Sequence, residues 1–198
     1  MQSEATIVHE HHADVDSIDV FGFWLYIMSD CILFACLFAT FLVLHAPGSP
    51  GPYLSSYLNL RDVLIETFFL LFSNFTFCLA TLSLYQQNMK KLQLWLGASF
   101  LLGAGFIFME LKEFISLAHE GFRWDVNAEA SSFFTLVGTH GLHVSCGLIW
   151  ILLMMIQLPM LKDKSIARRR MTYLGLFWNF LDIVWIFLFT IVYLMGAI

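Results

Sequence analysis

The sequence predicts an all-α integral membrane protein, a bundle of five transmembrane helices. Two features of the composition favour this class. Of the 198 residues, 59% are hydrophobic and only 13% are charged, whereas soluble domains carry about 25% charged residues. The mean hydropathy is positive. A third observation, the length of the apolar runs, sets the number of helices.

Five apolar runs are long enough to cross a hydrocarbon core of about 30 Å, which takes about 20 helical residues. Lipid cannot satisfy backbone N–H and C=O groups, so unbroken runs of this length must be helices. Turn-forming residues at 47–52 separate the first two runs, and polar loops at 86–91 and 159–170 separate later ones. The expected helices are 21–45, 63–85, 92–117, 132–158 and 171–197.

The segment 1–20 precedes the first helix and is expected to be an acidic cytoplasmic tail, with 21–198 forming the five-helix domain. It contains no Lys or Arg, so it lacks the basic region of a cleaved signal peptide. His9, His11 and His12 lie in this tail. Because a short segment supplies no fixed ligand geometry, we expect these histidines to be solvated.

The distribution of basic residues predicts the orientation. If the N-terminus and the loops at 86–91 and 159–170 share one side, that side carries seven Lys and Arg residues, and the other has Arg61 and Arg123. The excess puts the N-terminus in the cytoplasm and the C-terminus in the periplasm. The basic run 168–170 is expected to be a solvated stop-transfer cluster, not a nucleic-acid site.

Ionisable groups at membrane depth are candidates for functional residues. Asp30 and Asp182 lie about 14–16 Å deep in the first and fifth helices, at a rise of about 1.5 Å per residue. His140 and His143 enter from the other side, about 12 and 16 Å deep on the fourth helix. The two histidines are three residues apart and project from neighbouring positions. They could bind a metal, or they could form hydrogen bonds to Asp30, Asp182, Thr139 or Asn179. We favour the second interpretation because a metal needs further ligands.

A second group of carboxyl residues is expected near the outer ends of the second and third helices. It comprises Glu66, Glu110 and Glu113, with Lys112 beside them. These residues could line a cleft or bind a lipid headgroup. They could equally be interfacial residues, with Lys112 extending its ammonium group toward water.

Several chemistries are disfavoured. All four cysteines fall within expected helices and form no CxxC pair, so neither a disulfide nor a thiolate metal site is expected. Only His140 and His143 are deep, and both lie on one helix, whereas a haem with two axial imidazoles usually draws them from separate helices. We therefore assign no catalytic, cofactor-binding or metal-binding residue to this chain.

Seven blocks of sequence resemble subunit III of the haem–copper respiratory oxidases, in the five-helix form found in bacterial bo-type ubiquinol oxidases. They cover all five expected helices in order. The blocks are FGFW at 21–24, MSDCILF at 28–34, ETFFLLFS at 66–73, GAGF at 103–106, GTHGLHV at 138–144, FWNFLDIVW at 177–185 and VYLMG at 192–196.

The resemblance implies a non-catalytic subunit of a proton-pumping ubiquinol oxidase in the bacterial inner membrane. Haems and copper would belong to subunit I, and subunits I, II and IV and membrane lipids would be the partners. The role implied is assembly, lipid binding and support of proton uptake. Asp30 occupies a position where the family carries a buried acidic residue. Asn179 stands where the family usually has His. An amide donates and accepts hydrogen bonds but does not titrate, so the resemblance implies a hydrogen-bonding role at this position and no titrating one.

Two other classes compete with this interpretation. A stand-alone proton or ion translocator would use Asp30 and Asp182, and a membrane metalloenzyme would use His140 and His143. Isolated polar groups do not make a continuous path across a membrane. We therefore favour the subunit interpretation.

Overall fold

The computed structural model describes residues 2–45, 60–159 and 164–194, with side chains described from Val20 and, after the last gap, from Ser165. Within these ranges there are five helices long and apolar enough to cross a membrane, and no strand. The predicted five-helix bundle is confirmed. The helices are α1 (Gln2–Leu44), α2 (Leu60–Tyr85), α3 (Met89–His119), α4 (Ala128–Gln157) and α5 (Lys164–Leu188), followed by a π-helical segment η2 (Phe189–Leu194).

The helix ends differ from the expected ones. The first helix begins at Gln2, so the backbone of the expected tail continues the transmembrane helix, and α5 begins seven residues before position 171. The turn-rich segment 47–52, Lys162 and the end of the chain beyond Leu194 lie outside the described residues, as do the side chains of His9, His11 and His12. The expected orientation therefore stays a prediction.

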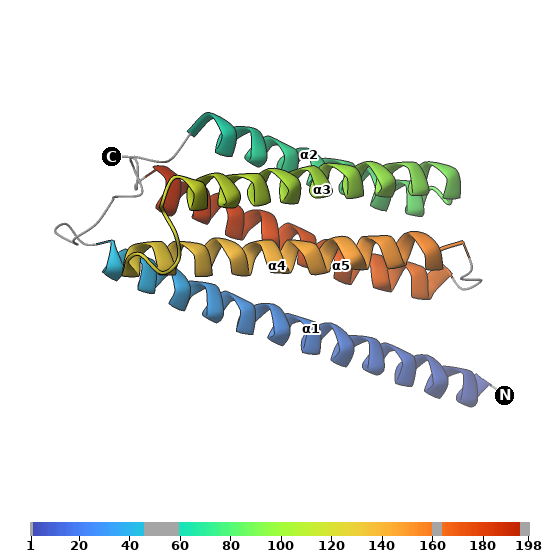
Figure 1. Cartoon of the computed structure of the whole chain (residues 1–198). Coiled ribbons are helices and arrows are strands. Elements are labelled where there is room, and N and C mark those ends of the chain that lie inside the picture. The colour runs from blue at the N-terminus through green and yellow to red at the C-terminus, as the bar shows by residue number, and fades with distance from the viewer. Residues whose placement is uncertain (1, 46–59, 160–163, 195–198) are drawn as a thin grey trace.

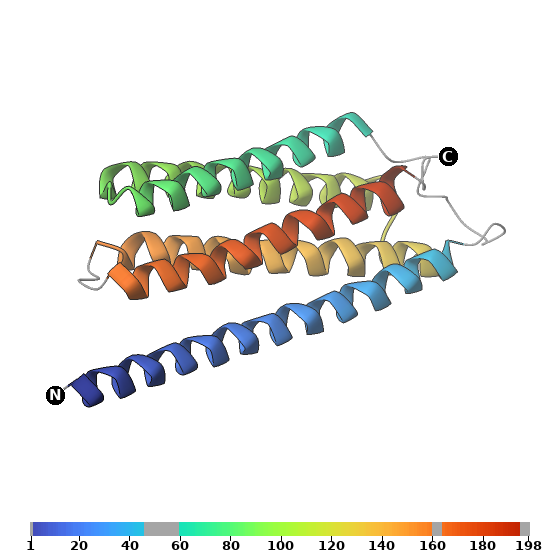
Figure 2. The same cartoon turned by 180° about the vertical axis from the view of Figure 1, so that it is seen from behind.

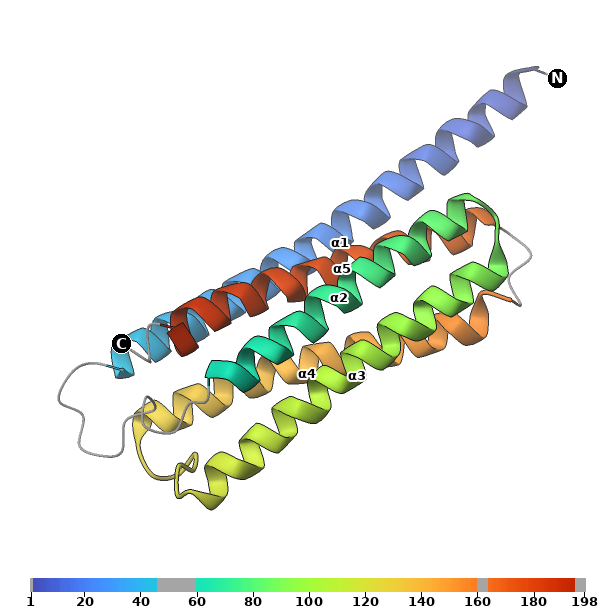
Figure 3. The ribbon, with the colours of Figure 1, turned by 90° about the horizontal axis from the view of Figure 1, so that it is seen from above.

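The helices form three levels when seen from the side. In Figure 1, α2 and α3 lie at the top, α4 and α5 in the middle and α1 at the bottom, and the reverse view in Figure 2 shows α5 crossing between α2 and α1. The view from above in Figure 3 shows the N-terminal part of α1 extending past the other helices. Helix α1 contacts α4 and α5, whereas α3 contacts α2 and α4. α5 therefore links the α2–α3 pair to α1.

Local signals explain the closest pair of helices. The turn at 86–88 contains Gln87 with φ of 58°, and the Asn88 side chain accepts a hydrogen bond of 3.3 Å from the backbone N–H of Lys91 at the start of α3. Inside the pair, Ser73 Oγ donates to the carbonyl oxygen of Ser99 at 2.9 Å, and Thr76 Oγ1 lies 2.8 Å from Ser99 Oγ. Small hydroxyl residues at such contacts let helices approach closely in lipid.

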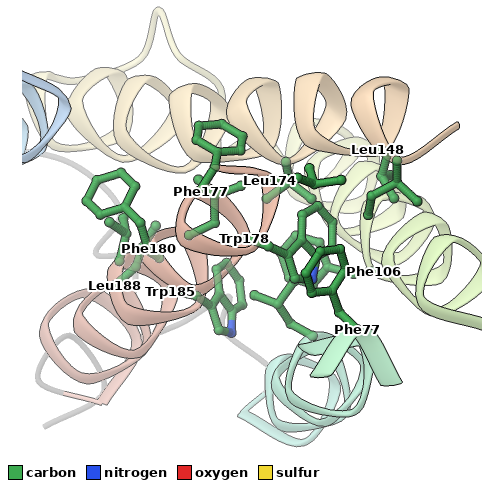
Figure 4. Close-up of a cluster of buried hydrophobic side chains, with 14 of the residues drawn as sticks. Phe77, Phe106, Leu148, Leu174, Phe177, Trp178, Phe180, Trp185 and Leu188 are labelled. Carbon is green, nitrogen blue, oxygen red and sulfur yellow. The ribbon is translucent and has the colours of Figure 1, made fainter. Parts of the chain in front are cut away.

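The core is centred on Trp178 of α5, which is 1% exposed. Figure 4 shows its indole between Phe106, Leu148 and Phe77 of the neighbouring helices. Its six-membered ring faces two glycines, Gly103 on α3 and Gly147 on α4. A methyl group would lie 3.2 Å from Trp178 Cη2 at the first and 2.7 Å from Trp178 Cζ3 at the second. The two glycines therefore make the space that the indole fills.

Candidate functional site

The polar groups at mid-membrane depth meet on one side between α1 and α4. His143 Nε2 lies 3.8 Å from Asp30 Oδ2, and both side chains are mostly buried. The other ring nitrogen, Nδ1, lies 2.7 Å from the carbonyl oxygen of Thr139. A carbonyl oxygen only accepts hydrogen bonds, so Nδ1 carries a proton. Attraction between Nε2 and the carboxyl group then requires one further proton, either on the imidazole or on Asp30.

His140 lies one turn away and has no such partner. It is fully buried, and neither ring nitrogen forms a hydrogen bond. Its ring stacks on Trp185 with centroids 5.3 Å apart and meets Phe106 edge-on at 6.0 Å. The Trp185 indole N–H in turn donates to Thr67 Oγ1 at 3.0 Å. The structure thus places His140 among aromatic rings of α1, α3 and α5, namely Phe34, Phe106 and Trp185, without a hydrogen-bond partner among the described residues.

Asp182 faces a different neighbour. It is 5% exposed, and neither carboxyl oxygen forms a hydrogen bond with another described residue. The Asn74 side chain of α2 lies close enough to interact with this carboxyl group. The expected polar layer therefore divides into three separate places, with Asp30 at His143, His140 among aromatic rings and Asp182 beside Asn74.

The N-terminal end of α2 and the C-terminal end of α3 hold the second polar group. Glu66 and Glu110 are 1% and 3% exposed, and each has an oxygen without a hydrogen-bond partner. Glu113 lies within electrostatic range of both. Its Oε2 accepts a hydrogen bond of 3.4 Å from the hydroxyl of Tyr193, which is fully buried in η2. The structure brings the three expected glutamates together.

Gly141 explains how Glu110 fits between α3 and α4. A methyl group at Gly141 would lie 2.7 Å from both carboxyl oxygens of Glu110. Since this is shorter than any ordinary contact of a methyl group, the carboxyl group needs a glycine opposite it. The sequence motif GTHGLHV at 138–144 contains this glycine, but the sequence alone does not say which side chain occupies the space.

One polar contact was not anticipated from the sequence. His45 Nδ1, at the end of α1, lies 2.8 Å from Glu129 Oε1 in the first turn of α4, and the Glu129 side chain is 2% exposed. The contact joins the C-terminal end of α1 to the N-terminal end of α4, two helices that are far apart in the chain. The sequence places both residues at the ends of apolar runs and on the same expected side of the membrane. This placement was the one sequence feature that could have suggested the contact.

The donor sets do not resemble a metal centre. In the described part of the chain, no three His, Cys, Asp or Glu side chains are grouped so that they could hold one ion. Within His143, Nδ1 is engaged by Thr139. What the arrangement offers is hydrogen bonding and charge pairing between helices.

Comparison with known proteins identifies the family. The family model of cytochrome c oxidase subunit III matches residues 1–197. This chain belongs to the cytochrome c oxidase subunit III family. The resemblance seen in the sequence blocks is confirmed.

Several curated relatives of this subunit III chain are similar over almost their whole length. The cytochrome bo(3) ubiquinol oxidase subunit 3 of Pseudomonas aeruginosa is 50% identical over 190 residues, 96% of this chain and 91% of that protein. The protein of the same name from Buchnera aphidicola is 43% identical over 185 residues, 93% of this chain and 95% of that protein. The cytochrome c oxidase subunit 3 of Bacillus sp. (strain PS3) is 40% identical over 190 residues, 96% of this chain and 92% of that protein.

Asn179 stands on α5 at the position where the resemblance noted in the sequence implies a histidine. Its side chain is exposed on α5 and, among the described residues, makes no hydrogen bond. It lies 14 residues after Ser165 and 15 before Leu194 in the span Ser165–Leu194, which places it about 21 Å from either end. Of the partners considered for His140 and His143, Asn179 is therefore not one, and its amide points out of the bundle at the middle of the membrane.

Proposed function

We propose that this chain is the non-catalytic subunit III of a proton-pumping terminal ubiquinol oxidase in the bacterial inner membrane. The observation that carries the proposal is the 50% identity to a cytochrome bo(3) ubiquinol oxidase subunit 3 over 96% of the chain. Subunits I, II and IV are its proposed partners. The haems and copper are assigned to subunit I, and this chain contributes assembly, lipid binding and sustained proton uptake.

The outward-facing Asn179 supports the role of a subunit. Exposed hydroxyl groups elsewhere in the spans bond to carbonyl oxygens of their own helices: Ser29, Thr40, Thr135, Thr172 and Thr190. The Asn179 amide has two donors and an acceptor and no such local bond. Lipid chains offer no partner, so an exposed amide at mid-depth favours a polar group from another transmembrane chain.

Co-purification tests the proposal. This chain carries an affinity tag and is purified from membranes of the source cell after solubilisation with a mild detergent. A large haem-containing chain should co-purify with it, and the purified material should show ubiquinol-dependent oxygen uptake. Asn179→Leu should lower the recovery of that partner. Thr172→Val is the matched control on the same helix, because the exposed Thr172 hydroxyl donates to the carbonyl oxygen of Arg168 in its own helix. Recovery of the chain alone from intact membranes would contradict the proposal.

Two experiments separate the alternatives. A stand-alone translocator using Asp30 and Asp182 should move protons when the chain alone is placed in liposomes, and we expect no such flux above the leak of empty liposomes. A metalloenzyme using His140 and His143 should retain one metal ion per chain after purification. We expect no stoichiometric haem, copper or zinc, and a bound metal lost in His143→Ala would favour the metalloenzyme.

A further inference from the structure

A polar cavity opens at the N-terminal end of α2 and the C-terminal end of α3. Its volume is about 320 Å³, and it is lined by Asp62 and Glu66 of α2 and by Lys112, Glu113 and Glu120 of α3, with Met109, Ser116 and Leu117 completing the wall. Four carboxyl groups and one ammonium group thus surround one space. The cavity lies apart from the contact between Asp30 and His143, which joins α1 to α4.

Glu66 is the residue that indicates a binding site in this cavity. It is 99% buried, it lines the cavity, and its Oε2 has no hydrogen-bond partner. The ion pairs of the described residues use neither Glu66 nor Lys112. Burying a carboxylate is costly unless a cation or hydrogen-bond donors accompany it. A ligand that brings both would complete the site.

The neighbours of Glu66 add to the demand for a cation. Glu113, Glu110 and Asp62 lie within electrostatic range of it, so the local field favours positive charge. In the described part of the chain no three of these groups converge as metal ligands would. A primary ammonium group suits separate acceptors better, because it carries three N–H donors pointing in different directions.

The depth of the cavity matches the lipid headgroup boundary. Helix α3 has 31 residues, a length of about 46 Å at about 1.5 Å per residue, so each end extends about 8 Å beyond a hydrocarbon core of about 30 Å. Glu113 lies six residues before His119, about 9 Å from the end of the helix. Its carboxyl group therefore lies at the boundary between headgroups and acyl chains.

Lys112 supplies the complementary charge. It is exposed and lines the same cavity as Glu66 and Glu113. An ammonium group within reach of the boundary can bind a phosphate while its aliphatic stem lies against the apolar wall. The cavity thus offers acceptors for an amine and a donor for a phosphate, at the depth where a zwitterionic lipid carries both.

We propose that this cavity binds the headgroup of an aminophospholipid, with Glu66 and Glu113 accepting hydrogen bonds from its primary ammonium group and Lys112 pairing with its phosphate. The proposal specifies a ligand class for the lipid binding included in the proposed function and rests on it. It goes beyond that function because it predicts that the cavity binds one lipid headgroup in preference to others. Assembly with other subunits does not require such selectivity.

The test measures lipid retention by the full-length chain in its purified complex. The complex is exchanged into mixed micelles containing dioleoyl phosphatidylethanolamine, its N-methyl and N,N-dimethyl forms, or dioleoyl phosphatidylcholine, and native mass spectrometry counts retained lipids. Each methyl group removes one N–H donor at nearly constant charge. We expect retention to fall stepwise along the series, with a difference of at least fivefold between its ends.

Matched variants locate the site. Glu66→Gln and Lys112→Met should each reduce the preference for phosphatidylethanolamine to less than half. Asp125→Asn removes a carboxylate from the exposed α3–α4 connection, where it pairs with Arg123, and should leave the preference unchanged.

Three results would overturn the proposal. Equal retention of phosphatidylethanolamine and phosphatidylcholine by the unsubstituted complex would do so even if a variant failed to fold. Equal behaviour of Glu66→Gln and Asp125→Asn would remove the cavity as the site. Displacement of the lipid by free ethanolamine at the same concentration would show that the ligand of the cavity is a soluble amine and not a lipid. In each case, intact co-purification with the oxidase partners would leave the proposed function standing.

Discussion

The two glycines that face Trp178 give a quantitative test of the core. In Gly147→Ala, the new methyl group would lie 2.7 Å from Trp178 Cζ3, 3.0 Å from Cε3 and 3.3 Å from Phe177 Cε1. Ordinary carbon contacts are about 3.5–4.0 Å, so the indole must move by several tenths of an ångström. Movement toward α3 is limited, because that part of the ring lies so close to Gly103 that a Cβ atom there would be 3.2 Å from Trp178 Cη2.

This crowding should destabilise the chain by about 1–3 kcal/mol, the usual effect of overpacking a rigid core. The corresponding increase in the unfolding equilibrium constant is about 5- to 150-fold. Reversible unfolding of the purified chain in mixed micelles with increasing sodium dodecyl sulfate, followed by tryptophan fluorescence, measures it. Gly97→Ala is the control, because its methyl group would lie 3.6 Å from the flexible end of Met155 and should change the stability by less than about 0.5 kcal/mol.

A double substitution separates crowding from a general intolerance of alanine. Trp178→Phe removes the outer part of the ring system that Gly147→Ala meets. We expect the second substitution to be less harmful in this background by about 1 kcal/mol or more, as for residues in direct contact. Equal stability of Gly147→Ala and Gly97→Ala, or strict additivity with Trp178→Phe, would refute the assignment of Trp178 to this space.

Further predictions concern Asp30, the orientation of the chain in the membrane and the contact between His45 and Glu129. Asp30→Asn should leave initial quinol oxidation by the whole complex largely intact, whereas Asp30→Leu should weaken co-purification of partners because His143 loses its neighbour, at about 1–3 kcal/mol; loss of initial turnover by a fully assembled Asp30→Asn complex would contradict the non-catalytic role. A reporter enzyme active only outside the cytoplasm should work when fused after residue 198 and fail when fused within 163–167, and the reverse pattern would overturn the orientation. His45→Ala leaves the buried Glu129 carboxyl group without its partner and should lower the midpoint of detergent-induced unfolding, by about 1–3 kcal/mol in stability; an unchanged midpoint would show that the contact contributes nothing.

The sequence was sufficient for the number and class of the helices because their length and apolarity are properties of single segments. It was also sufficient to place the ionisable groups by depth, since the helical rise is constant. The seven sequence blocks, which follow the family's order across all five helices, add the family. None of these signals requires knowledge of how one helix faces another.

Facing directions could not be obtained in the same way. His140 and His143 are three residues apart and equivalent by depth and residue type, yet His143 lies against Asp30 while His140 stacks on Trp185. The choice depends on rotation of α4 about its axis, which is set by the fit of large side chains from other helices. Asn179 gives the clearest case, because an inward contact was expected and the side chain points outward.

The contacts of α1 affect the order in which the bundle can assemble. This helix is made first, but the helices it contacts, α4 and α5, are the last two in the chain. Until residue 143 has entered the membrane, Asp30 has no histidine beside it, and α1 must stay in the bilayer as a separate segment. Its span is the most apolar of the five, which offsets the about 2.5–3.5 kcal/mol that an aspartate near the centre adds to insertion. A nascent chain stalled after α3 should therefore hold a folded α2–α3 hairpin and an independent first helix, and closure of the bundle should wait for the C-terminal half.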